Sequence, residues 1–171
     1  MSVITESGMN FRVDDKKTFR IEESEFMRRH NAVKSVEYIE LRKGRIVLVE
    51  AKSSFPKVDG QTDFNKNVSD ISEKFAHSLE YFISCKMGYN KCKADEIPAE
   101  LADCDMIRDK GLDFILVINC TGMDRGVIPH MLSVIQDAFT KKMRAVCEIW
   151  NATVKVIDRE LAVRLGIAAD G

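Results

Sequence analysis

The sequence predicts an α/β fold, an α/β sandwich with a mixed central β-sheet flanked by helices, and three patterns support this prediction. The run Arg45–Lys52 is apolar on both alternating faces until its last residues, as expected for a central strand covered on both sides. A second apolar run, Leu112–Cys120, has the length and composition of another buried strand. Between them, apolar residues recur at three- and four-residue steps over 68–82, which indicates an amphipathic helix.

The first half of the chain contains two predicted hairpins. We expect, in order, a hairpin of Asn10–Val13 with Thr18–Ile21, a short helix capped by Ser24 and running to His30, a hairpin of Val36–Leu41 with Arg45–Lys52, and a loop over Phe55–Lys66. Because 171 residues with 45% hydrophobic side chains suit one core, we treat residues 1–171 as a single domain.

The second half alternates helices and strands. We expect, in order, the amphipathic helix ending near Gly88, a connecting segment over Tyr89–Lys110 with a short helical turn, the strand Leu112–Cys120, a helix from Pro129 to Met143, one strand or a pair of strands over Val146–Ile157, and a short helix over Arg159–Leu165.

Two charged residues stand out at the end of the central strand. Glu50 and Lys52 place a carboxylate and an ammonium on one face of an otherwise apolar strand. If Lys43 and Gly44 form the hairpin turn, the register sets Glu37 opposite Glu50. Like charges in this arrangement destabilise a strand pair, and a divalent cation between them would reverse that effect.

The hairpin Val36–Ser54 resembles the PD-(D/E)XK nuclease-like superfamily, in which an acid on one strand and a Glu-x-Lys triplet on the next bind a metal ion and activate water. The triplet here would be Glu50-Ala51-Lys52, with Glu37 in the place of the first acid. The resemblance implies a restriction-endonuclease-like fold and a nuclease-like domain. It also implies a further acid from the first helix, for which Glu25 is the first candidate and Glu23 the second.

The chemistry implied by the resemblance is metal-dependent phosphodiester hydrolysis of nucleic acid by a DNA endonuclease, with defence against foreign DNA or repair as its expected setting. Mg²⁺ or Mn²⁺ would bind the carboxylates of Glu37 and Glu50 and the backbone carbonyl of Ala51, while Lys52 positions water or offsets charge on the phosphate. The catalytic set would thus be Glu37, Glu50, Lys52 and Glu25. The alternative is a non-catalytic member of the same fold that binds protein or nucleic acid within a larger complex. Glu50 and Lys52 could also form an ordinary surface pair.

Composition limits the remaining possibilities. The net charge of −1 gives no global basic field, so contact with DNA must come from local patches. Five cysteines without a Cys-x-x-Cys pair argue against a zinc knuckle or a disulfide framework, and we expect reduced thiols. Without a long apolar stretch or a signal-peptide pattern, we expect a soluble, cytoplasmic protein without a membrane partner. Its expected partners are nucleic acid and either a second copy in a homodimer or a partner subunit.

Overall fold

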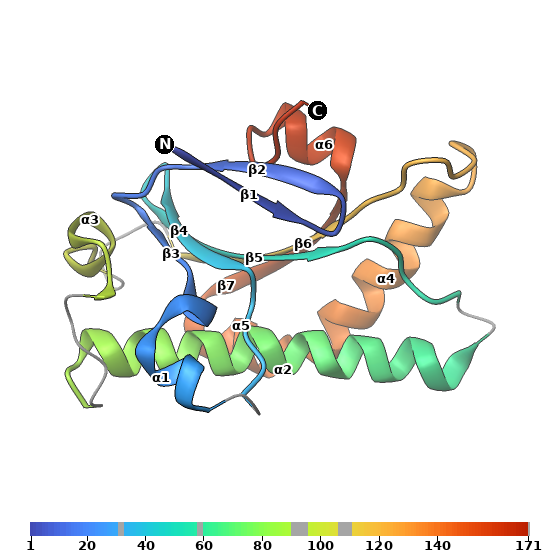
Figure 1. Ribbon diagram of the computed structural model, residues 1–171. Helices are drawn as coiled ribbons and strands as arrows, with labels where there is room; N and C mark the ends of the chain where they lie inside the picture. Colours follow the sequence, from blue (N-terminus) through green and yellow to red (C-terminus); the bar gives the residue numbers. More distant parts are fainter. Residues whose placement is uncertain (31–32, 58–59, 90–95, 106–110, 171) are drawn as a thin grey trace.

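The computed structural model describes residues 1–30, 33–57, 60–89, 96–105 and 111–170. Its centre is a mixed five-stranded sheet with the order β3 (Thr18–Phe19), β4 (Tyr38–Arg42), β5 (Arg45–Lys52), β6 (Leu112–Ile118) and β7 (Ala152–Asp158) (Figure 1). Strands β3 to β5 are antiparallel, and β5 to β7 are parallel. The predicted α/β class with a mixed sheet is therefore confirmed, and the strand with two apolar faces lies in the middle.

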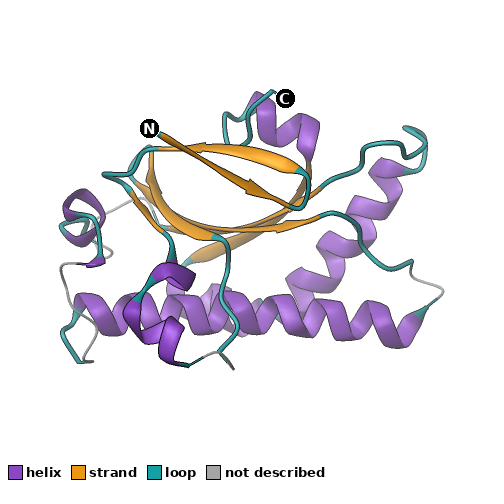
Figure 2. Ribbon diagram, viewed as in Figure 1, coloured by secondary structure: helices purple, strands orange, loops and turns teal. Residues whose placement is uncertain are grey.

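Helices cover one face of the sheet, and a hairpin covers much of the other (Figure 2). The long helix α2 (Gln61–Lys86) and α4 (Ile128–Lys142) pack against Leu48 and its neighbours on the first face. The hairpin of β1 (Ser2–Glu6) and β2 (Met9–Val13), together with α6 (Arg159–Arg164), packs against the second face. Each face of β5 therefore has its own apolar layer, because side chains of a strand alternate between the two sides.

The hairpin of β4 and β5 has the predicted turn and register. Lys43 and Gly44 both adopt left-handed backbone conformations, with φ of 50° and 75°. A two-residue turn of this kind matches the twist of the paired strands. Ile39 pairs with Leu48, and the ladder ends where Tyr38 pairs with Val49, one residue short of the predicted opposition of Glu37 and Glu50.

The predicted opening hairpin is wrong in its pairing. Strand β2 pairs with β1, a strand that the sequence did not predict. The two are joined by a turn at Ser7 and Gly8, with φ of 52° and 72°. Strand β3 instead pairs with β4 in the main sheet. Alternation of apolar and polar residues identifies strands, but the choice of partner depends on which apolar face remains to be covered.

The segments before α2 differ from the prediction at one boundary. Helix α1 (Glu25–Arg29) follows a 3₁₀ turn, η1 (Ile21–Glu23), and the Ser24 hydroxyl caps it by accepting a hydrogen bond from the Met27 amide at 3.2 Å, as expected. Helix α2 begins inside the predicted loop, at Gln61, because the buried Phe64 extends its apolar stripe by one turn. Glycine and polar residues had indicated a longer loop.

The end of the chain differs at the predicted strand over Val146–Ile157. Its first part is a helix, α5 (Arg144–Trp150), which ends where Asn151 takes a left-handed conformation with φ of 48°. Strand β7 begins directly after it. A short apolar run fits a helix or a strand equally well, so its pattern alone could not decide. The short helix α3 (Ala99–Ala102) and the terminal helix α6 agree with the prediction.

The cysteines differ in oxidation state. Cys85 is disulfide-bonded, so the expectation of reduced thiols is wrong for this residue. Cys104, Cys120 and Cys147 are free, and Cys92 lies outside the described residues.

In the described part of the chain, no helix combines the length and apolar character that crossing a membrane requires.

Candidate metal centre at Glu37 and Glu50

The Glu50 carboxylate lies at the centre of the candidate site and is completely buried, with 0% of the residue exposed. Its Oε1 atom pairs with the Lys52 ammonium at 3.0 Å and with the Lys74 ammonium at 2.7 Å. Its Oε2 atom is also buried, and no described group donates a hydrogen bond to it. A buried carboxylate oxygen without a donor is unfavourable, so this atom indicates a position where a cation or another ligand could bind.

Lys74 is a residue of the candidate site that the sequence did not identify. It comes from the middle of α2, which runs along the face of β5 that carries Glu50. Its side chain is 22% exposed, and its ammonium donates a hydrogen bond to Glu50. The only available signal was its position beside the apolar residues Ile71 and Phe75 on the helix, which does not identify a partner.

A backbone hydrogen bond holds Glu37 at the end of the hairpin where Glu50 lies. Its amide donates to the Val49 carbonyl at 3.0 Å, which continues the contact between the two arms of the hairpin past the end of β4. The preceding amide, that of Val36, donates to the buried Ser78 hydroxyl on α2 at 2.9 Å. Helix α2 therefore anchors both arms, through Ser78 on one and Lys74 on the other.

The electrostatics show that the two predicted carboxylates influence each other. The pKa of Glu37 is raised to about 7. Burial is the largest cause, and the negative charges of Glu50, Glu6 and Glu22 add to it, whereas the positive charge of Lys74 partly offsets the increase. Two carboxylates close enough to interact in this way compete for ionisation unless a positive charge joins them. The structure thus places Lys52 in contact with Glu50, and Glu37 within electrostatic reach of Glu50.

The other predicted site residues have different surroundings. The Ala51 carbonyl accepts a hydrogen bond from the Ser7 hydroxyl at 3.1 Å, which leaves one lone pair for a ligand. The Glu25 carboxylate pairs with Arg29 one turn later in α1, and Glu23 pairs with Arg20. The additional carboxylates that act on Glu37 are instead those of Glu6 and Glu22.

A hard divalent cation fits this set of donors. Glu37 and Glu50 would supply carboxylate oxygens, and Oε2 of Glu50 lacks a partner. Within the described ranges, no group of three or more His, Cys, Asp or Glu residues is arranged to hold a metal ion. Protein sites for Mg²⁺ often provide only one or two carboxylates and leave the remaining positions to water and phosphate. A site with two carboxylates is therefore sufficient.

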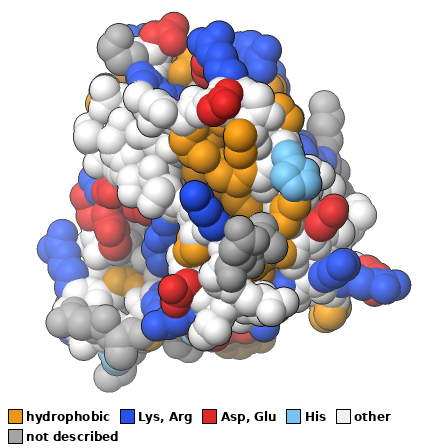
Figure 3. Space-filling model, turned by 90° about the vertical axis from the view of Figure 1, so that its right-hand side faces the viewer, with side chains coloured by type: hydrophobic (Ala, Val, Ile, Leu, Met, Phe, Trp, Pro, Cys, Tyr) orange, Lys and Arg blue, Asp and Glu red, His pale blue; other side chains and the backbone are white. Residues whose placement is uncertain are grey.

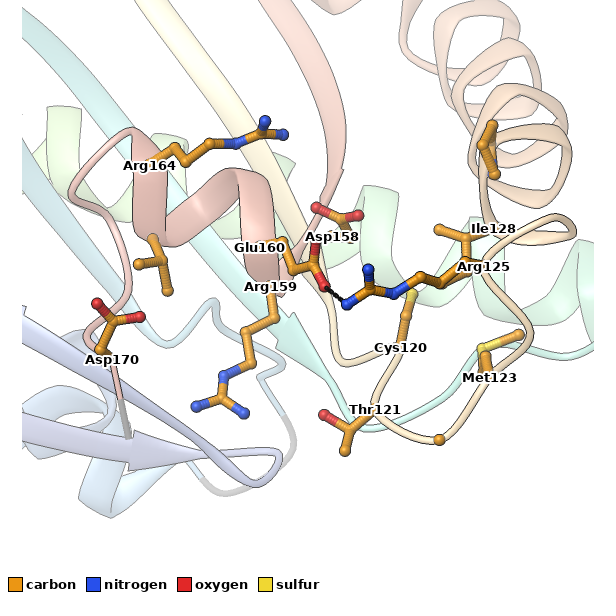
Figure 4. A pocket seen from close by; sticks show the side chains of 13 residues that line it. Cys120, Thr121, Met123, Arg125, Ile128, Asp158, Arg159, Glu160, Arg164 and Asp170 are labelled. Atoms are coloured by element: carbon orange, nitrogen blue, oxygen red, sulfur yellow. Dashed lines mark hydrogen bonds and ion pairs between the residues drawn. The ribbon is translucent and has the colours of Figure 1, made fainter.

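A separate hollow of about 770 Å³ lies at the carboxyl ends of β6 and β7. Its lining includes three arginines and three acidic residues, so its charges are balanced, and Arg125 pairs with Glu160 at 3.3 Å (Figure 4). Figure 3 views the molecule from this side and shows hydrophobic side chains gathered among charged ones. Since Lys52 aligns with Ile118 and Ile118 with Asp158, the hollow lies at the same end of the sheet as Lys52, beyond the neighbouring strand β6. Its lining does not include Glu37, Glu50 or Lys52.

No family model, curated protein or solved structure matches this chain, so any assignment of function depends on the site itself.

Proposed function

We propose that this protein is a metal-dependent nuclease of the PD-(D/E)XK type, with a restriction-endonuclease-like fold and DNA as its substrate. The observation that supports this most strongly is the buried Glu50, which has one oxygen without a donor and lies beside a second carboxylate and an amine. The sheet supports it too. The antiparallel meander of β3, β4 and β5 carries Glu50 on β5 and has Glu37 directly before β4, and helix α2 and the further strand β6 follow it, in the order that the resemblance implies.

Each residue has a distinct role in the proposed reaction. Mg²⁺ or Mn²⁺, when bound, would polarise the phosphate and lower the pKa of a water molecule. Glu37 and Glu50 would hold the cation through their carboxylate oxygens. Lys52 has a flexible stem and a partly exposed ammonium, 3.0 Å from Glu50, which can turn toward a phosphate oxygen and offset the charge that develops there.

The raised pKa of Glu37 couples metal binding to proton release. Burial first, and the Glu50 charge second, raise this pKa to about 7, so the carboxyl group is partly protonated at neutral pH. A cation favours the ionised form, and its binding therefore expels a proton from Glu37. Metal affinity should increase as the pH rises through 7.

One observation favours the alternative, a non-catalytic member of this fold that binds protein or nucleic acid. Lys52 and Lys74 both contact Glu50, and Lys74 also acts on Glu37, so the cluster has no excess of negative charge without a metal ion. In this alternative, the lysines serve permanently as the counter-charge.

Calorimetric titration with Mn²⁺ separates the two functions. We expect the wild-type protein to bind Mn²⁺ and Glu50→Gln to lose this binding, because a neutral amide replaces the central carboxylate. Glu148→Gln is the matched control, since Glu148 is an exposed residue of α5 that pairs with Arg144 at 2.9 Å. It should bind Mn²⁺ as the wild type does.

Cleavage assays then test the reaction itself. Single- and double-stranded DNA should be cut in the presence of Mg²⁺ and left intact in EDTA, and Glu50→Gln should reduce the rate by at least about 100-fold. Absence of Mn²⁺ binding at millimolar concentration, together with absence of cleavage, would support the non-catalytic alternative. Retention of DNA binding in a gel-shift assay would then identify nucleic acid as its partner.

A further inference from the structure

Two lysine side chains that are partly exposed to solvent contact the buried Glu50 carboxylate. The carboxylate itself is 0% exposed, whereas the side chains of Lys52 and Lys74 are 30% and 22% exposed. Both ammoniums contact the same atom, Oε1 of Glu50. A cation that arrives from solvent therefore reaches this carboxylate only after an ammonium has moved.

The charges of the cluster lead to the same conclusion. Glu37 and Glu50 carry at most two negative charges, and Lys52 and Lys74 carry two positive ones. A divalent cation would add two positive charges to a cluster that has no excess of negative charge. Repulsion at such short distances is strong in a partly buried site, so a nearby ammonium opposes metal binding.

The geometry indicates which ammonium can leave. Lys52 belongs to the strand that carries Glu50, and it has the proposed role at the phosphate. Lys74 projects from α2, whose position is fixed independently by the hydrogen bond between Ser78, one turn further along, and the Val36 amide. Its long stem can carry the ammonium into solvent while the helix stays in place.

We propose that Lys74 is an internal counter-cation, which holds Glu50 in the metal-free protein and is displaced when a divalent cation binds. Lys74 is thus a positioning residue rather than a catalytic one. This proposal rests on the proposed function, in which Glu50 is a metal ligand. It also explains how the protein tolerates a buried carboxylate without metal. The negative charge of a bound phosphate would help the metal ion to displace the ammonium.

The test compares Lys74→Met with Lys66→Met in Mn²⁺ titrations without nucleic acid. Methionine keeps the length and apolar stem of lysine and removes the charge. Lys66 lies on the same helix and is exposed, so its variant controls for a changed charge on α2. We expect Lys74→Met to bind Mn²⁺ about tenfold more tightly than the wild type. Lys66→Met and Lys74→Arg, which keeps the positive charge, should bind within about twofold of the wild type.

Thermal unfolding in EDTA supplies a second measurement. We expect a lower midpoint for Lys74→Met, because Glu50 loses a partner, and a larger upward shift of that midpoint on addition of Mn²⁺. If Lys74→Met is unfolded in EDTA, the Mn²⁺ concentration required to refold it measures the same affinity. A purely structural lysine would give weaker metal binding after its removal, and Mn²⁺ affinity equal to or below that of the wild type would overturn the proposal.

The outcomes distinguish this proposal from the proposed function. Metal binding by the wild type with unchanged or weaker binding by Lys74→Met refutes the role of Lys74 and leaves the nuclease proposal intact. Binding by Lys74→Met alone supports the role of Lys74 and refutes a metal-dependent function of the natural chain. Absence of binding in both proteins refutes both proposals.

Discussion

Among the buried carboxylates, Glu50 on β5 and Asp113 on β6 lie on adjacent strands, and their surroundings differ. Asp113 lies near the start of β6, and Arg45 donates to both of its oxygens, at 2.7 and 2.9 Å. Thr153 also donates to it, and the Lys155 ammonium lies 3.3 Å away. Burial would raise the pKa of Asp113, but the hydrogen bonds of Arg45 and Thr153 outweigh it and lower the pKa.

Glu50 has two positive partners as well, but both contact one oxygen and leave the other without a donor. The carboxylate of Glu37 interacts electrostatically with Glu50, and the pKa of Glu37 is raised rather than lowered. The comparison shows that burial and ion pairing alone do not identify a functional carboxylate. Incomplete satisfaction, with a neighbouring acid of like charge, is the more informative feature.

The largest expected effect is the loss of stability when the satisfied carboxylate is removed. Asp113→Asn should lower the free energy of unfolding by about 2–3 kcal/mol, because it replaces the charged acceptor of two hydrogen bonds from Arg45, at 2.7 and 2.9 Å, with a neutral amide. Glu50→Gln should cost less than about 1.5 kcal/mol, since both lysine ammoniums can turn to solvent. Urea denaturation in EDTA measures both changes.

A loss for Glu50→Gln as large as that for Asp113→Asn would mean that Glu50 is a structural ion pair. Asp113→Asn should keep the wild-type affinity for Mn²⁺, which serves as the control for folding.

A smaller effect is expected at the anchor that aligns Glu37. Ser78→Ala leaves the buried Val36 amide without an acceptor and should lower the free energy of unfolding by about 1–3 kcal/mol. It should also weaken Mn²⁺ binding, because Glu37 follows Val36 directly. Ser72→Ala is the control on the same helix. The Ser72 hydroxyl donates to the Val68 carbonyl within α2. Removing this hydroxyl leaves no amide without an acceptor, so the free energy of unfolding should change by less than about 0.5 kcal/mol.

Equal losses in the two serine variants would show that Ser78 contributes only packing. Mn²⁺ affinity that is unaffected in Ser78→Ala would show that the anchor does not align the site.

A further expected effect is a pair of opposite slopes in stability against pH. The pKa of Glu37 is raised from 4.5 to about 7, so the folded protein binds a proton that the unfolded chain releases. Its contribution to stability is complete below pH 4.5 and is lost as the pH rises through 7. The lowered pKa of Asp113 acts in the opposite direction, since its contribution is present above pH 3.8 and is lost as the pH falls further.

Denaturation midpoints of wild type and Glu37→Gln in EDTA, measured between pH 3 and 8, test both slopes. The variant should lose the decline between pH 4.5 and 7 and keep the decline in acid. A decline between pH 4.5 and 7 that persists in the variant would assign it to a group other than Glu37.

The sequence by itself determined the α/β class, the central position of β5 and the register of its hairpin. These features are local, because alternation defines the faces of a strand and a Lys-Gly turn with positive φ defines the pairing. They were enough to bring Glu37 toward Glu50. Local patterns could not assign the partner of β2 or separate α5 from β7, since both depended on which apolar surfaces remained uncovered.

Only the tertiary structure decided what surrounds Glu50. Lys74 lies 24 positions later in the chain, on a helix that packing of the core brings next to β5. Ser78 reaches Val36 from the same helix, and Ser7 reaches the Ala51 carbonyl from the opposite layer. Contacts over such separations follow from how apolar faces fit together, and the spacing of residues along the chain does not encode them.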